Sequence, residues 1–150
     1  MKVSLRSVGD AFLHMERLDA MDYFDYTYKH NYIEFSSSIY KVGTYNYNWH
    51  GCTEIFILLK GRVEMSCNDE TFIMEPLDVV IISPQVGHST LATEEDVVAF
   101  VVPVGNEFYQ QYDPDFGMYE FIVRSDASTR HNEFFTTLRH HAAMTMLLMH

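Results

Sequence analysis

The sequence is 150 residues long, about the length of one domain, and 47% of its residues are hydrophobic and 15% aromatic. That composition is sufficient for a buried core and excludes an intrinsically disordered chain. The net charge of −11, from 21 acidic and 10 basic side chains, excludes direct binding to nucleic acid, because an acidic surface repels phosphate.

Features that would direct the chain to a membrane are missing from the sequence. The longest apolar run, at residues 54–60, is too short to cross a bilayer. The first ten residues lack the long apolar stretch that a secretory signal needs. We therefore expect a cytoplasmic protein with no membrane contact.

The chain contains two cysteines, Cys52 and Cys67, which are too few for a disulfide scaffold and are not spaced as in a zinc knuckle. In a reducing compartment, such thiols most often serve as small apolar groups of the core. We expect that role for both, without a bond between them.

Most of the predicted elements are strands. Residues 9–20 suit one short amphipathic helix or an irregular cap. From residue 23 the composition favours strands, and EFSSSIYKVG indicates one that ends at Gly43. Further short β-branched or aromatic runs follow, bounded by turn-forming residues: TEIFILL, RVEMSC, TFIM, DVVIIS, VVAFVVPV and MYEFIVR. Such strands predict a mainly β sandwich or small barrel, without alternating βαβ units.

Two tight turns are predicted among these strands. Gly61, within LLKGRVEM, can adopt the positive φ that a hairpin turn needs. Asn68 and Asp69 occupy the turn of SCNDETF. Both stretches therefore predict hairpins.

The first hairpin also predicts a register. A two-residue turn at residues 60–61 places Leu59 opposite Arg62, and Glu54 then lies opposite Cys67. Cys52 would be diagonal to Cys67 in the same sheet.

The hydrophobic pattern changes after Arg124. Several polar residues here are plausible helix N-caps: Ser125, Asp126, Ser128 and Thr129. Apolar residues then recur at spacings of three and four, which predicts one amphipathic helix: Phe135, Leu138, Ala142, Met146 and Met149. We expect a β domain at residues 1–124 and a helical segment at residues 125–150. Because soluble monomers rarely expose such an apolar stripe, we expect the helix to mediate a dimer.

Polar residues before and within TEIFILL form the candidate site. Side chains alternate along a strand, so His50 and Glu54 should face the same way as Asn48 and Cys52. His88 follows another buried strand. If the two strands meet, His50, Glu54 and His88 converge.

These residues carry a resemblance to the cupin superfamily. NWHGCTEIFILLKG, at residues 48–61, resembles the first cupin motif, HxH-x(3,4)-E-x(6)-G. LDVVIISPQVGH, at residues 77–88, resembles the second, G-D-x(4)-P-x-G-x-x-H, with Asp78 and His88 as matches. The resemblance implies a double-stranded β-helix, a jelly-roll barrel of two facing antiparallel sheets with a pocket inside.

Some positions depart from the motifs, because an amide replaces the first histidine and turn-forming residues are also replaced: Asn48, Leu77, Ser83 and Gln85. Metal cupins hold Mn, Fe, Ni or Zn with three histidines and a glutamate, whereas His50, Glu54 and His88 remain here. An amide is a weak ligand, so we expect no bound metal and no cofactor, although two histidines and a carboxylate can hold non-haem iron. Ligand-pocket polar groups, a metal site and simple strand-end residues stay open as alternatives.

With its incomplete metal set and an amphipathic helix after the β domain, the sequence resembles one subset of cupins, the AraC-type transcription regulators. That resemblance implies a sensor domain for a small molecule such as a sugar, a helical dimerisation segment, and a separate helix-turn-helix domain that binds DNA. The chain resembles the sensor half, which implies a homodimer without catalytic activity. The alternative is a small metal-dependent cupin enzyme of dioxygenase or sugar isomerase type, since cupins host many functions.

The implied ligand site combines orienting polar groups with apolar walls, as small-molecule pockets usually do. Its expected members are His50, Glu54, His88, Asn48, Trp49, Phe56, Leu58 and Met65. Tyr45, Tyr47 and Trp49 alternate along the chain, and either stack on a ring-shaped ligand at the pocket rim or serve ordinary sheet packing.

Overall fold

The structure, a computed structural model, describes residues 23–30, 33–43 and 45–148. The helix predicted at residues 9–20 and the last apolar residue of the helical stripe, Met149, lie outside these ranges.

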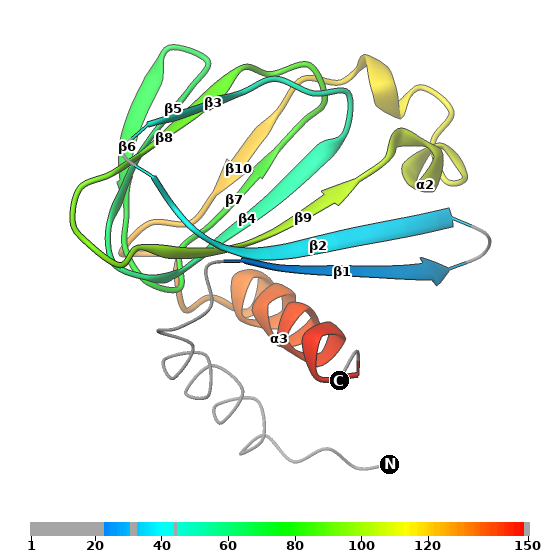
Figure 1. Cartoon of the computed structure of the whole chain (residues 1–150). Coiled ribbons are helices and arrows are strands. Elements are labelled where there is room, and N and C mark those ends of the chain that lie inside the picture. Colours follow the sequence, from blue (N-terminus) through cyan, green and yellow to red (C-terminus); the bar gives the residue numbers. More distant parts are fainter. Residues whose placement is uncertain (1–22, 31–32, 44, 149–150) are drawn as a thin grey trace.

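Ten strands, two α-helices and one 3-10 helix make up the described chain (Figure 1). The strands are β1 (Tyr23–His30), β2 (Ile33–Lys41), β3 (Asn46–Asn48), β4 (Thr53–Lys60), β5 (Val63–Cys67), β6 (Glu70–Met74), β7 (Val79–Ile82), β8 (His88–Ala92), β9 (Val98–Val104) and β10 (Ile122–Arg124). The helices are α2 (Asn106–Gln110), the 3-10 helix η1 (Phe116–Met118) and α3 (Glu133–Leu148).

The strands form two antiparallel sheets. One has the order β1-β2-β9-β4-β7-β10 and the other the order β3-β8-β5-β6. An eight-stranded jelly roll is formed by β2-β9-β4-β7 of the first sheet and β3-β8-β5-β6 of the second. The first sheet has one additional strand at each edge, β1 and β10. The mainly β barrel with a C-terminal helix is confirmed.

The hairpin predicted from LLKGRVEM is wrong. Gly61 has the expected positive φ, +83°, but it carries the chain from β4 in the six-stranded sheet to β5 in the four-stranded sheet. Glu54 lies opposite Ile82 of β7, and Cys67 lies opposite His88 of β8, so the predicted pairing of Glu54 with Cys67 is also wrong. β4 pairs with β7 on one side and β9 on the other, which leaves no free edge for β5.

The hairpin predicted from SCNDETF is confirmed. Asn68 and Asp69 have φ of +50° and +66° and connect the antiparallel strands β5 and β6. Residues with positive φ at both central positions define the turn that matches strand twist best.

The stretch MYEFIVR forms a strand only at its end, and neither α2 nor η1 was predicted. Asp113 accounts for part of the difference. Its carboxylate accepts hydrogen bonds from the Asp115 backbone N–H and the Tyr119 hydroxyl. Aspartates that bond nearby groups in this way favour turns over strands.

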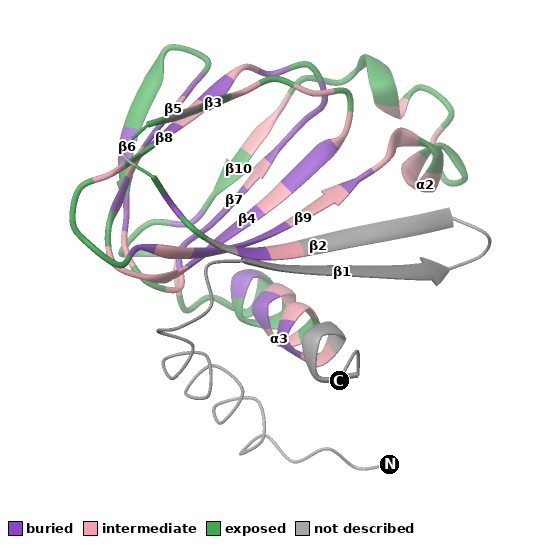
Figure 2. Cartoon of the chain, viewed as in Figure 1, coloured by how far each residue is buried: buried purple, intermediate pink, exposed green. Residues whose placement is uncertain are grey.

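Apolar side chains pack in two clusters, one between the two sheets and one between the six-stranded sheet and α3. Figure 2 shows buried segments in both sheets and along α3. The inner cluster fills the space between the sheets with residues such as Phe56, Leu58, Met65, Phe72 and Ile82. The outer cluster joins Ile57, Val79 and Phe100 of the sheet to Phe135 and Ala143 of α3. The central strands β9, β4 and β7 are therefore buried on both faces, which explains their nearly continuous apolar runs.

Helix α3 begins after Asn132, whose side-chain oxygen accepts the Phe135 backbone N–H at 3.0 Å. Asn132 is thus the cap. The predicted caps lie earlier, where Asp126 accepts hydrogen bonds from Ser128 and Thr129 in a separate turn. In the part of the chain that the structure describes, no helix is long and apolar enough to cross a membrane.

Candidate functional site

The structure brings His50, Glu54 and His88 together at one end of the barrel. Their nearest ligating atoms all lie within 4.8 Å of one another. His50 Nε2 is 2.8 Å from Glu54 Oε2, and His88 Nε2 is 3.4 Å from Glu54 Oε1. Glu54 belongs to β4 and His88 to β8, so the two facing sheets each contribute to the cluster.

The strand expected to run through His50 is interrupted. β3 ends at Asn48 and β4 begins at Thr53, so His50 lies in the connection between the two sheets. His50 is half-buried, whereas His88 is only 1% exposed. The cluster therefore opens to solvent on the side of His50 and is closed on the side of His88.

Both histidines are oriented by backbone carbonyls. His50 Nδ1 is 3.1 Å from the Cys52 carbonyl oxygen, and His88 Nδ1 is 3.1 Å from that of Val86. A carbonyl only accepts, so each Nδ1 carries the proton and donates it. Each Nε2 then faces Glu54. His88 Nε2 is buried and has no hydrogen-bond partner.

The cluster holds a His50–Glu54 ion pair. Burial raises the pKa of Glu54, but the hydrogen bond from His50 and the contact with His88 outweigh burial and lower that pKa to about 2. The contact with Cys52 and the hydrogen bond to Glu54 raise the pKa of His50 above its ordinary value. Near neutral pH the pair therefore contributes one positive and one negative charge.

The two cysteines are free. Cys67 is buried, and burial together with the negative charges of Glu54 and Glu70 raises its pKa to about 11. A thiol in that environment stays protonated and is a poor nucleophile. Cys67 thus behaves as a small core group, whereas Cys52 is half-buried beside His50, with Sγ 3.4 Å from Nδ1.

A divalent metal fits the cluster by its donor set. Two Nε2 atoms and one carboxylate face a common point, and each Nδ1 is fixed by a carbonyl, as is usual for metal-binding histidines. A metal held there would supply Lewis-acid chemistry. Asn48 lies opposite His88 in the β3–β8 ladder, at the place where cupins have a further histidine. Because an amide is a weak ligand for transition metals, Asn48 lowers the metal affinity expected of this site.

The other expected site residues divide between the core and the surface. Phe56, Leu58 and Met65 have no exposed surface and belong to the packed core between the sheets. Trp49 is 61% exposed, and its Nε1 donates to the Gln85 carbonyl. Tyr45 and Tyr47 are similarly exposed, so the aromatic row does not belong to the core.

Thr90 is a further candidate for the site that was not predicted from the sequence. It is 2% exposed, and its hydroxyl has no hydrogen-bond partner. Thr90 lies two residues after His88 on β8 and therefore points to the same inner face. Period-two spacing from His88 would have identified it. His88 Nε2 and Thr90 Oγ1 are thus two buried polar atoms on the inner face of β8 that make no hydrogen bond, although His88 Nε2 also lies 3.4 Å from Glu54 Oε1.

At two positions where the sequence departs from the cupin motifs, the backbone keeps the conformation expected of glycine. Leu77 and Gln85 replace glycines, yet they have φ of +76° and +69°. The Gln85 backbone N–H donates to the His50 carbonyl at 2.9 Å, which ties the segment before His88 to the His50 connection. The positive φ is therefore retained at a cost in strain, since a bulky residue rarely adopts it.

Comparison with known proteins gives one family and several solved structures of similar fold. Residues 30–145 match the family model of the AraC-like ligand binding domain. A search of curated proteins found no match. Among solved structures, the Cnp3 cupin domain of Schizosaccharomyces pombe is similar, with 14% identity, a TM-score of 0.48, and coverage of 63% of this chain and 75% of that chain. A cupin-2 domain protein from Shewanella frigidimarina has 17% identity, a TM-score of 0.48, and coverage of 67% and 99%.

Proposed function

Because the chain belongs to the AraC-like ligand binding domain family, we propose that it is the small-molecule-sensing part of an AraC-type transcription regulator. In this proposal the protein is a cytoplasmic homodimer. The ligand binds at the His50–Glu54–His88 end of the barrel and leaves it unchanged. Contact with DNA is made by a separate helix-turn-helix domain, since the acidic charge of this chain disfavours phosphate.

One observation carries the proposal. His88 Nε2 is buried without a hydrogen-bond partner and faces the same space as Glu54. A buried polar atom left unpaired costs about 1–3 kcal/mol, so a ligand that supplies its partner gains affinity there. The unpaired hydroxyl of Thr90 on the same face of β8 adds a second point for a polar ligand such as a sugar.

A thermal-shift screen of small polar metabolites tests the ligand site. We expect a ligand that raises the melting temperature of the parent but not that of His50→Ala or His88→Ala, because those side chains orient the ligand. At a ligand concentration of 100 Kd the stabilisation should be about 2.7 kcal/mol. Chromatography of the incubated ligand should recover it unchanged.

His131→Ala is the matched control, because His131 is exposed and lies outside the cluster. It should bind the ligand as the parent does. If the parent converts the ligand to a product and both His50→Ala and His88→Ala do not, the protein is an enzyme and the sensing function is contradicted.

The second candidate function is a metal-dependent cupin enzyme, favoured by the paired Nε2 atoms and the carboxylate. We expect purified protein to lack a stoichiometric transition metal, because Asn48 stands where a further histidine would complete the set. Elemental analysis of the parent and of His50→Ala measures this. About one Fe, Mn, Ni or Zn per chain, lost in the variant, would favour the enzyme.

The dimer is proposed to form on the exposed side of α3. Phe135 and Ala143 pack on the sheet, but Phe134 is 54% exposed beside a surface hollow of about 430 Å³ that Leu138 also lines. Phe134→Glu and Leu138→Glu should therefore halve the mass measured by light scattering, since each places a charge in the proposed interface.

Phe134→Glu is the sharper of the two dimer variants, because Leu138 also packs partly against the barrel. The matched control is Met118→Glu, which places the same charge at an exposed apolar residue outside α3 and should keep the dimer. An unchanged mass in both α3 variants would show that α3 only covers the sheet.

A further inference from the structure

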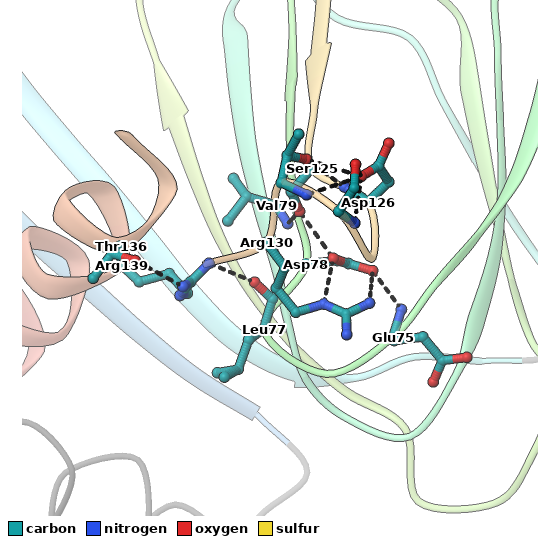
Figure 3. A network of polar contacts seen from close by, with 11 residues as sticks. Glu75, Leu77, Asp78, Val79, Ser125, Asp126, Arg130, Thr136 and Arg139 are labelled. Carbon is teal, nitrogen blue, oxygen red and sulfur yellow. Dashed lines mark hydrogen bonds and ion pairs between the residues drawn. The ribbon is translucent and has the colours of Figure 1, made fainter. Parts of the chain in front are cut away.

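A buried carboxylate joins the start of β7 to the segment that precedes α3 (Figure 3). Asp78 is 1% exposed, and its Oδ1 accepts hydrogen bonds from Ser125 Oγ at 2.9 Å and Arg130 Nε at 2.8 Å. Its Oδ2 accepts from Arg130 Nη2 at 3.1 Å and from the Glu75 backbone N–H at 2.8 Å. Two-pronged guanidinium–carboxylate contacts are among the strongest hydrogen bonds. Asp78, Ser125 and Arg130 are called the Asp78 cluster below.

The turn that contains Asp78 is strained and contacts α3 directly. Leu77 has φ of +76°, a conformation that a leucine rarely adopts. Its carbonyl accepts a hydrogen bond from Arg139 Nη1 at 2.9 Å, and Arg139 is a nearly buried residue of α3. Its backbone N–H donates to the Leu58 carbonyl of β4. The turn therefore keeps its conformation through contacts with both the barrel and the helix.

The strand that starts at this turn leads to the ligand site. β7 has only four residues, which span about 13 Å. At its far end Ile82 lies opposite Glu54, and the connection that follows is tied to the His50 carbonyl by the Gln85 backbone N–H. That connection ends at His88. One short strand thus has the histidine cluster at one end and the Asp78 cluster at the other.

We propose that the turn at Glu75–Asp78 couples the His50–Glu54–His88 cluster to α3. A shift of β7 at the ligand site moves Leu77 and Asp78, and Arg139 and Arg130 transmit that shift to α3. The helix then changes between a docked and a released position on the sheet. The coupling rests on the proposed sensing function, because a ligand must bind at the histidine cluster and prefer one position.

Hydrogen–deuterium exchange of the full chain measures the coupling without any ligand. Arg130→Met removes both contacts with Asp78 at similar side-chain length. It should speed exchange roughly tenfold in the amides of α3 and in those of residues 85–91, relative to the amides of β6. The reverse variant, His88→Ala, should speed exchange in α3 as well, since coupling between two sites is reciprocal.

The matched control is Arg62→Met, which removes an exposed ion pair with Glu75 on the same turn. It should change exchange in neither segment. Faster exchange in α3 alone after Arg130→Met would overturn the proposal and leave the Asp78 cluster as a simple attachment of the helix. An equal change in β6 would also overturn it, because that result indicates global destabilisation.

Leu77→Gly keeps the test decisive if Arg130→Met does not fold. Glycine accepts the positive φ without strain, so the variant should stay folded. A more flexible turn should transmit less of the shift of β7 to α3. The effect of His88→Ala on α3 exchange should then be smaller in the Leu77→Gly background than in the parent, and an equal effect would overturn the proposal. A ligand that binds the parent while exchange shows no coupling would refute the coupling and keep the sensing function.

Discussion

Replacing Asp78 with alanine should lower the free energy of unfolding by about 3–5 kcal/mol, the usual cost of removing one partner of a buried ion pair. The change leaves the Arg130 guanidinium, the buried Ser125 hydroxyl and the Glu75 backbone N–H without the acceptor that they share. Because the Arg130 side chain is 20% exposed, water compensates part of its loss, and the lower end of the range is expected. Urea unfolding followed by circular dichroism measures the difference.

The control for this variant is Asp96→Asn, because Asp96 has φ of +57°, a conformation that asparagine also tolerates. Asp96 also pairs with a basic side chain, Lys41, at 2.9 Å, but both partners are more than half exposed. An exposed pair contributes about 0–1 kcal/mol, so the control should change stability little. Similar small losses in both variants would contradict the importance assigned to the burial of Asp78.

Replacing Phe56 with alanine should cost about 3–5 kcal/mol, because a large side chain in a filled core leaves a cavity. Phe56 has no exposed surface and packs between the sheets, on the same face of β4 as Glu54. Packed side chains, Phe56 among them, therefore fill the barrel interior next to the histidine cluster, and this layer is called the closed floor. The loss in the free energy of unfolding, again from urea denaturation, tests whether that floor is filled.

Ile73→Ala is the control for the core variant, because Ile73 is 47% exposed on β6. It should cost less than about 1 kcal/mol. A loss below about 1.5 kcal/mol for Phe56→Ala would show instead that Phe56 borders open space, as the wall of an empty ligand pocket would.

The sequence predicted the strands better than their partners. Alternation and β-branched runs located β2, β4 to β7 and β9, because these patterns reflect which side chains a strand buries. The short strands β3 and β8 were not predicted. The pairing of β4 with β5 was wrong although Gly61 has the expected conformation. A glycine with positive φ permits a sharp turn, but whether the next strand stays in the same sheet depends on which distant strands occupy the edges of β4.

The candidate site was predicted in part. The spacing of His50, Glu54 and His88 indicated convergence, because two cupin-like motifs place these residues on facing sheets. The Asp78 cluster was not predicted, although Asp78 was noted as a motif match. Its partners Ser125 and Arg130 lie 47 and 52 residues further along the chain, and no local pattern relates them.

By itself, the sequence determined the mainly β class, the C-terminal helix, and the residue types that face the barrel, since these follow from periodicity and spacing along the chain. Only the tertiary structure decided the jelly-roll strand order, the closed floor under the histidine cluster, and the contact of Arg130 and Arg139 with the turn at Leu77 and Asp78. Local patterns specify which face of a strand or helix is apolar. They do not specify which distant surface covers that face, because that choice depends on packing between segments far apart in the sequence.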